Sequence, residues 1–269
     1  MSGKKRRWPA ETNLAALKTL AHTLLWFDIQ PTKLSPLVVK HPFTDSGLVG
    51  IRNEDGSLSA GNLLDDPGAL HSWRENVRQQ INEAETAAGL LLLVTKPYRL
   101  GYLKLAAPYL CEQDAALFLS YAWISTESPN DDPNLSKRSL LAMFRSIDPQ
   151  MLMDEEERGL FQSLDDVVTV YRGVTSYNAQ NVKALSWTLN REVAEWFAHR
   201  FGQNGTVYEA QVKKENIYAV FLGRNEEEVI VDPERLMGLS QLPEQEQGQG
   251  QGMETVSYTH LTLPTNREV

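Results

Sequence analysis

The chain is poor in the residues that build disulfides and metal centres. It has a single cysteine among 269 residues, so no intramolecular disulfide can form, which is typical of proteins from reducing compartments. That residue, Cys111, follows an apolar leucine, and we expect a core position rather than a nucleophile. The five histidines are scattered without the spacing of a zinc site, so we expect no metal: His22, His41, His71, His199 and His260.

Positive charge and long apolar runs are also scarce. The formal net charge is −9, and an average field of that sign repels phosphate, which argues against nucleic acid or an anionic membrane as a partner. The basic run at residues 4–7 is typical of a solvated terminus. The apolar stretch at residues 14–27 is interrupted by charge and is followed by no signal-peptide cleavage site. We therefore expect a cytoplasmic protein, acting in its own cell or after delivery into a host.

The N-terminal part of the chain predicts one helix followed by turns. Leucines and alanines spaced three and four apart from Leu14 to Leu25 share one helical face, and Thr12 could cap that helix. The remainder of residues 1–75 is rich in turn signals, and we expect a separate segment of unknown role there. Residues 76–164 are mainly helical, with clear periods over 113–124 and 136–147 and a turn cluster at 128–134 that we interpret as a plain loop.

After residue 164 the pattern changes to short β-branched or aromatic runs bounded by turn residues. We expect one helix between the second and third runs, from Asn190 to Phe201, with Val193, Phe197 and Phe201 as its buried stripe and Gly202 as its left-handed exit. The runs that predict strands are residues 167–172, 182–188, 205–212, 215–221 and 228–232.

The expected domain therefore spans residues 76–238, with a helical lobe at 76–164 and a β core at 165–238. Residues 239–269 follow as a disordered tail rich in glycine and glutamine. Residues 255–269 back-translate into a string that resembles a sequencing-library adapter, so we expect them to be a translated artefact.

Three short elements in the β core carry chemistry, while P-loop and Gly-x-Gly-x-x-Gly patterns are absent. Arg172-Gly173 ends one predicted strand, and Ser186-Trp187-Thr188 ends the next. Glu226-Glu227-Glu228 opens the last strand, where adjacent like charges destabilise unless they serve a purpose. Each element alone is common: a terminal arginine, alternating hydroxyls and an acidic turn all occur in proteins without any site.

In this order the three elements resemble the arginine–serine–glutamate class of mono-ADP-ribosyltransferases, known from bacterial toxins and phages. The resemblance covers about residues 165–235. It implies an α+β fold, a split and mainly antiparallel β-sandwich around an NAD⁺ cleft, preceded by a helical lobe. It also implies that ADP-ribose passes from NAD⁺, used as a co-substrate without a metal, to a protein acceptor with release of nicotinamide.

The resemblance also implies a role for each site residue. Glu228 would stabilise the oxocarbenium-like transition state and bond the ribose, and Ser186 would hold Glu228. Arg172 would contact the pyrophosphate, and Arg200 would either be a second phosphate contact or complement the dipole of its helix. The nicotinamide end would be met by Gly173, Thr188 and the rings of Trp187 and Trp196. Phe201 could stack there too, but its helical spacing favours the core.

Glu226 points to arginine as the acceptor. A guanidinium is protonated at neutral pH, and a second carboxylate can orient it and act as general base. Strand alternation would place Glu226 and Glu228 on one face and Glu227 on the other. We expect Phe221 and Arg224 to face the target protein. Two alternatives remain: an NAD⁺ glycohydrolase with water as acceptor, and an inactive fold that serves as a binding module.

Overall fold

In the computed structural model, residues 7–35, 37–52, 56–202 and 204–243 are described. The first helix, α1 (Leu14–Leu25), is amphipathic as predicted. Its N-cap is Asn13, whose side chain accepts the Ala16 N–H, and not Thr12. The Thr12 hydroxyl instead bonds Asp114 and accepts the Cys111 N–H at 2.9 Å. Thr12 thus fastens the chain before α1 to a later helix.

Short antiparallel strands follow α1 where the sequence predicted only turns. One sheet has three strands, β1 (Gln30–Pro31), β2 (Val38–His41) and β3 (Thr44–Ser46), and a second is a hairpin of β4 (Leu48–Arg52) and β5 (Leu58–Asn62). These strands are short or irregular in burial: β2 alternates exposed and buried positions over only four residues, and Leu48 and Leu58, which open β4 and β5, are exposed. That irregularity explains why the sequence pattern did not reveal them.

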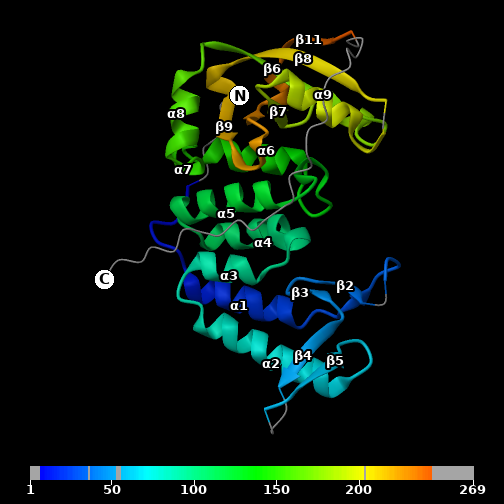
Figure 1. The fold of residues 1–269 in the computed structure, drawn as a ribbon. Coiled ribbons are helices and arrows are strands. Elements are labelled where there is room, and N and C mark those ends of the chain that lie inside the picture. The colour runs from blue at the N-terminus through cyan, green and yellow to red at the C-terminus, as the bar shows by residue number, and fades with distance from the viewer. Residues whose placement is uncertain (1–6, 36, 53–55, 203, 244–269) are drawn as a thin grey trace.

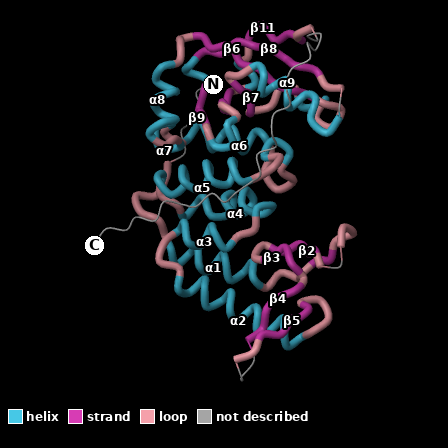
Figure 2. Tube along the Cα trace, in the orientation of Figure 1, coloured by secondary structure: helices cyan, strands magenta, loops and turns pink. Residues whose placement is uncertain are grey.

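The middle of the chain is a stack of helices between these strands and the C-terminal sheet (Figures 1 and 2). Helices α5 and α6 match the two periods predicted at 113–124 and 136–147, and residue 75 lies inside α2 rather than at a boundary. The helices are α2 (Pro67–Glu83), α3 (Ala87–Leu93), α4 (Arg99–Ala106), α5 (Glu112–Ser125), α6 (Lys137–Ser146), α7 (Pro149–Leu152) and α8 (Glu155–Ser163).

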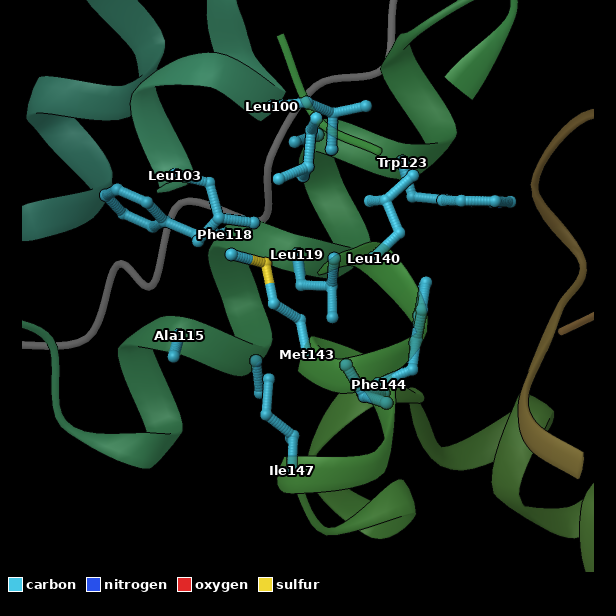
Figure 3. Packing of buried hydrophobic residues seen from close by; sticks show 14 of the residues in the cluster. Leu100, Leu103, Ala115, Phe118, Leu119, Trp123, Leu140, Met143, Phe144 and Ile147 are labelled. Atoms are coloured by element: carbon cyan, nitrogen blue, oxygen red, sulfur yellow. The ribbon is translucent and has the colours of Figure 1, made fainter. Parts of the chain in front are cut away.

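One hydrophobic core joins this stack to the sheet. The buried cluster extends from Leu17 in α1 to Val231 in the sheet, so the N-terminal helix and the C-terminal strands bury apolar surface together. Figure 3 shows the part of the cluster contributed by α4, α5 and α6. There Trp123 and Phe144 pack edge to face, with ring centroids 5.2 Å apart. Cys111 is only half-buried, at the cap of α5, so the expected core position is wrong.

The C-terminal part forms a six-stranded antiparallel sheet in the order β11-β8-β6-β7-β10-β9. The α+β class is therefore confirmed. Strands β6 and β7 share one registered pair, Tyr171 with Thr188, so the sheet consists of two three-stranded halves joined at a single point. The strands are β6 (Val167–Val174), β7 (Ser186–Thr188), β8 (Thr206–Lys213), β9 (Ile217–Phe221), β10 (Glu228–Val231) and β11 (Met237–Gln241).

Helix α9 (Arg191–His199) covers this sheet through small residues. Asn190 caps it and Gly202 has a φ of +67°, as predicted. Its buried face is Ala194 and Ala198, whereas Val193 and Phe197 are half-buried and the side chain of Phe201 lies outside the described residues. The predicted stripe is thus wrong, because the helix lies too close to the strands for large side chains. A Cβ on Gly173 would come within 2.2 Å of the Ala194 carbonyl oxygen.

Two boundaries differ from the sequence prediction. Strand β11 pairs with β8, so the expected domain end at residue 238 falls inside a strand. Strand β7 begins only at Ser186 rather than at residue 182. The expectations for residues 244–269, including the adapter-like segment, lie outside the described residues. Within the described ranges, no helix is both long and apolar enough to cross a bilayer.

Candidate functional site

Three neighbouring strands bring the predicted motifs together. Arg172 lies on β6, Ser186 begins β7 and Glu228 begins β10, and these strands are consecutive in the sheet. Strands β6 and β7 share a single registered pair. The Arg172 side chain adds a second link between them, because its Nη1 donates to the Ser186 carbonyl oxygen at 2.6 Å. The site therefore lies where the two halves of the sheet meet.

Glu228 is the buried centre of this group, with 6% of its surface exposed. Its Oε1 accepts hydrogen bonds from the Ser186 hydroxyl and from the Trp123 indole nitrogen, the latter at 3.1 Å. Burial raises the pKa of Glu228, while the Ser186 bond, the Arg224 charge, the Trp123 bond and the Arg172 charge all favour the ionised form. Its Oε2 accepts no hydrogen bond from the part of the chain described here, which leaves that oxygen for a ligand.

The Arg172 guanidinium lies beside this carboxylate. Its Nε is shielded from solvent and has no hydrogen-bond partner among the described residues. Burial lowers the pKa of Arg172 to about 10, and the charges of Glu228 and Asp131 act in the opposite direction. The side chain therefore stays cationic at neutral pH, with an unused donor of the kind that binds phosphate or carboxylate oxygens.

The loop at residues 128–134 packs against the site, a contact that its turn residues do not predict. The Asn130 side-chain oxygen accepts the Leu185 N–H at 2.9 Å, next to Ser186. Asp131 accepts from the Asn181 amide at 2.9 Å and contributes the negative charge felt by Arg172. The loop that the sequence predicted to be plain thus supports the segment that leads into β7.

The segment between β9 and β10 has an unusual backbone. Arg224, Asn225 and Glu227 have φ angles of +77°, +55° and +43°, and no other non-glycine residue among those described has a positive φ. Such conformations cost side-chain-bearing residues free energy and are typical of functional loops. Because strand β10 begins only at Glu228, the alternation predicted for Glu226 and Glu228 is wrong: a kinked loop carries Glu226.

Thr188 fixes this loop and is not free for a ligand. Its hydroxyl donates to the Glu226 carbonyl oxygen at 2.7 Å and accepts the Asn190 N–H at 3.0 Å. Only 6% of its surface is exposed. The expected contact between Thr188 and nicotinamide is therefore replaced by a structural one, which places Glu226 close to Glu228.

Glu226 forms an ion pair with Arg224, with Nη2 3.0 Å from Oε2. Counted with its backbone, Arg224 is an exposed residue. Its side chain alone is only 25% exposed, because it folds inward onto the Glu226 carboxylate. Burial raises the pKa of Glu226 to about 7; the charges of Arg224 and Arg200 lower it and that of Glu228 raises it further. A carboxylate that titrates near neutrality is suited to general base catalysis.

Several sequence-predicted residues lie elsewhere than expected. Trp187 is 2% exposed and its indole donates to the Ala184 carbonyl oxygen, so its ring has no free face for nicotinamide. The need for a glycine at position 173 is explained by the close approach of α9. Phe221 is fully buried and does not face a target protein. Arg200 stacks over Phe197, 4.9 Å from the ring centroid, and its charge reaches Glu226.

Two residues of the site were missed by sequence reasoning. Trp123 and Asp131 come from the helical part and are remote in sequence from the strands that they meet. A buried tryptophan on an apolar helix face and an aspartate in a turn both have ordinary structural explanations, so no signal in the sequence singled them out.

Two further features lie apart from this site or are absent among the described residues: a hollow near the N-terminal segment and a group of metal ligands. Within the described ranges, no group of three or more histidine, cysteine or acidic side chains is placed to hold a metal. A hollow of about 720 Å³ lies between the segment before α1 and helices α5 and α7, lined by residues such as Trp8, Cys111 and Met151 and by none of the site residues. Comparison of the chain with protein-family models, curated proteins and solved structures finds no match.

Proposed function

We propose that the protein is an NAD-dependent mono-ADP-ribosyltransferase that modifies arginine. The observation that carries the proposal is the buried Glu228 carboxylate, which Ser186 and Trp123 hold through one oxygen while the other accepts no hydrogen bond from the described residues. Cleavage of the nicotinamide–ribose bond generates positive charge on the ribose. A fixed carboxylate beside the anomeric carbon stabilises that charge only as it develops, which is what accelerates the reaction.

The surrounding groups fit the rest of the substrate. The Arg172 guanidinium is buried, and its Nε has no hydrogen-bond partner among the described residues, which suits an oxygen of the NAD⁺ pyrophosphate. Glu226, two residues before Glu228 and with a pKa of about 7, is suited to take a proton from an attacking guanidinium. Strands β6 and β7, joined at a single pair, support the finer proposal of an ADP-ribosyltransferase-like split sheet.

The direct test supplies the protein with NAD⁺ labelled in the ADP-ribose and with agmatine, a small arginine analogue. The proposal predicts release of nicotinamide together with labelled agmatine. Release of nicotinamide with free ADP-ribose as the sole labelled product would make the protein an NAD⁺ glycohydrolase. If NAD⁺ binds but stays intact, the site is a binding module.

A further inference from the structure

The Arg224 side chain occupies the position that an acceptor arginine needs. Its guanidinium contacts Glu226 at 3.0 Å, and both side chains are largely shielded, at 25% and 18% exposed. The charge of Arg224 also acts on Glu228, so the guanidinium lies near both carboxylates. An acceptor must meet the same two requirements, contact with the general base and proximity to the carboxylate beneath the ribose.

The backbone of the loop favours this inward position. Arg224 has φ 77° and ψ 10°, in the left-handed region that arginine rarely adopts. The Thr188–Glu226 hydrogen bond and the turn bond from Asn225 N–H to the Leu222 carbonyl oxygen fix both sides of the kink. A strained conformation that directs a cation onto the proposed base therefore belongs to the fold and is not a chance surface contact.

We propose that Arg224 is an automodification site, at which the protein transfers ADP-ribose to its own side chain; this inference rests on the proposed function. The bond between nicotinamide and C1′ of the ribose breaks, and nicotinamide leaves with the bonding electrons. A terminal nitrogen of Arg224 forms the new bond to C1′, and the proton that it sheds passes to Glu226. The products are nicotinamide, ADP-ribosylated Arg224 and a proton, so no further reactant is needed.

An acceptor on the same chain gives the reaction a kinetic signature. Because Arg224 and Glu226 belong to one loop, the step is intramolecular and its rate per molecule does not depend on protein concentration. Arg78 offers a matched control, since it also forms an ion pair with a glutamate, Glu75, at 2.5 Å, but on the distant helix α2.

The experiment incubates the full chain with labelled NAD⁺ and maps the label by peptide mass spectrometry. We expect ADP-ribose on the peptide that contains Arg224, with a labelled fraction that rises at the same rate over about a tenfold range of protein concentration. Arg224→Lys removes the label from that peptide, because an ammonium lacks the guanidinium's geometry. Arg78→Lys leaves the label in place.

A protein that modifies agmatine but carries no label on Arg224 would overturn this inference and leave the proposed function intact. Equal labelling of Arg78 and Arg224 would also overturn it, because the reaction would then be unselective. If no nicotinamide is released under any condition, the proposed function fails, and the inference fails with it.

Discussion

At the scale of single residues, the site depends on a carboxylate whose two oxygens have different tasks. Ser186 and Trp123 hold Oε1 of Glu228, whereas Oε2 accepts no hydrogen bond from the described residues and is the oxygen that we propose for the ribose. Glu228→Gln keeps the size and the hydrogen-bonding capacity of the side chain but removes the charge. We expect nicotinamide release to fall by about 10²–10³, because the lost interaction exists mainly in the transition state. The affinity for NAD⁺, measured by calorimetry, should change only a few-fold; near-normal turnover would assign catalysis to another group.

Glu226 provides a pH-dependent prediction at the same scale. Burial raises its pKa from 4.5 to about 7, and a general base works only when deprotonated. The ratio of transfer to hydrolysis should therefore rise between about pH 6 and pH 8, with a midpoint near 7. The ratio isolates Glu226, because protonation of Glu228 slows both reactions together. Glu226→Gln should remove transfer and its pH dependence while NAD⁺ hydrolysis persists.

The neighbouring Glu227 supplies the control for this prediction. Its backbone carbonyl accepts the Leu189 N–H at 3.1 Å, and Glu227→Gln retains that bond, so both activities should be nearly unchanged. Equal effects of the two substitutions, or loss of hydrolysis with Glu226→Gln, would contradict the assignment of Glu226. The raised pKa has a second consequence: the folded chain binds an extra proton between about pH 4.5 and 7, so this group's contribution to stability falls as pH rises through that window.

The sequence allowed some contacts of this site to be predicted and not others. The contact between Ser186 and Glu228 was expected, because the resemblance to the arginine–serine–glutamate class implies that this serine holds the glutamate. The inward turn of Arg224 was not, since a charged residue in a loop ordinarily faces solvent. The burial of Trp187 was not predicted, because a three-residue strand shows too little alternation to decide which of its sides is buried.

At the scale of elements, α8 positions the loop that carries Glu226. Glu157 is buried, and its carboxylate accepts the Leu222 N–H at the start of the loop and the Asp154 N–H at the cap of its own helix, both at 3.0 Å. Burial raises the pKa of Glu157 while these two bonds lower it. Glu157 is thus a positioning residue that joins the helix end to the loop between β9 and β10.

Glu157→Ala should loosen that loop and reduce kcat for transfer by about tenfold, corresponding to loss of one buried hydrogen bond at the site. The KM for NAD⁺ should change little, because the residues proposed to bind it lie on the strands. Glu157→Gln keeps an acceptor for Leu222 and should restore most of the rate. The exposed neighbour Glu156→Ala is the control. If Glu157→Ala and Glu157→Gln both lowered stability and had the same kcat, Glu157 would be a purely structural residue.

The elements also show where sequence patterns were sufficient. Helices α5 and α6 follow periods long enough to recognise, and strands β6 and β8 to β10 lie within the β-branched or aromatic runs that predicted strands. The strands β1 to β5 do not, and β11 lay in a stretch that the polar tail obscured. The buried face of α9 depends on Gly173 and Gly205 across the interface, and no pattern within the helix itself contains that information.

At the scale of the whole molecule, the helical stack forms one core with the sheet and also reaches the Glu228 carboxylate. Trp123 of α5 is fully buried and packs against Phe144 (Figure 3), and its indole nitrogen donates to Glu228 across 105 positions of sequence. The helices before the sheet are therefore part of the proposed active site. Any displacement of α5 relative to β10 would alter the environment of Glu228.

Trp123→Phe tests this coupling, because it removes the N–H donor and keeps an aromatic ring in the core. Without that donor the ionised form of Glu228 is less stabilised, so its pKa rises further. The pH profile of nicotinamide release should then shift to higher pH, with a loss of about tenfold in rate at neutral pH. Phe144→Leu, which alters the same aromatic pair without any polar atom, should lower thermal stability and leave the profile where it was. Were both variants to lose stability with unshifted profiles, Trp123 would be a core residue alone, and the helical stack would support the sheet without contributing to the site's chemistry.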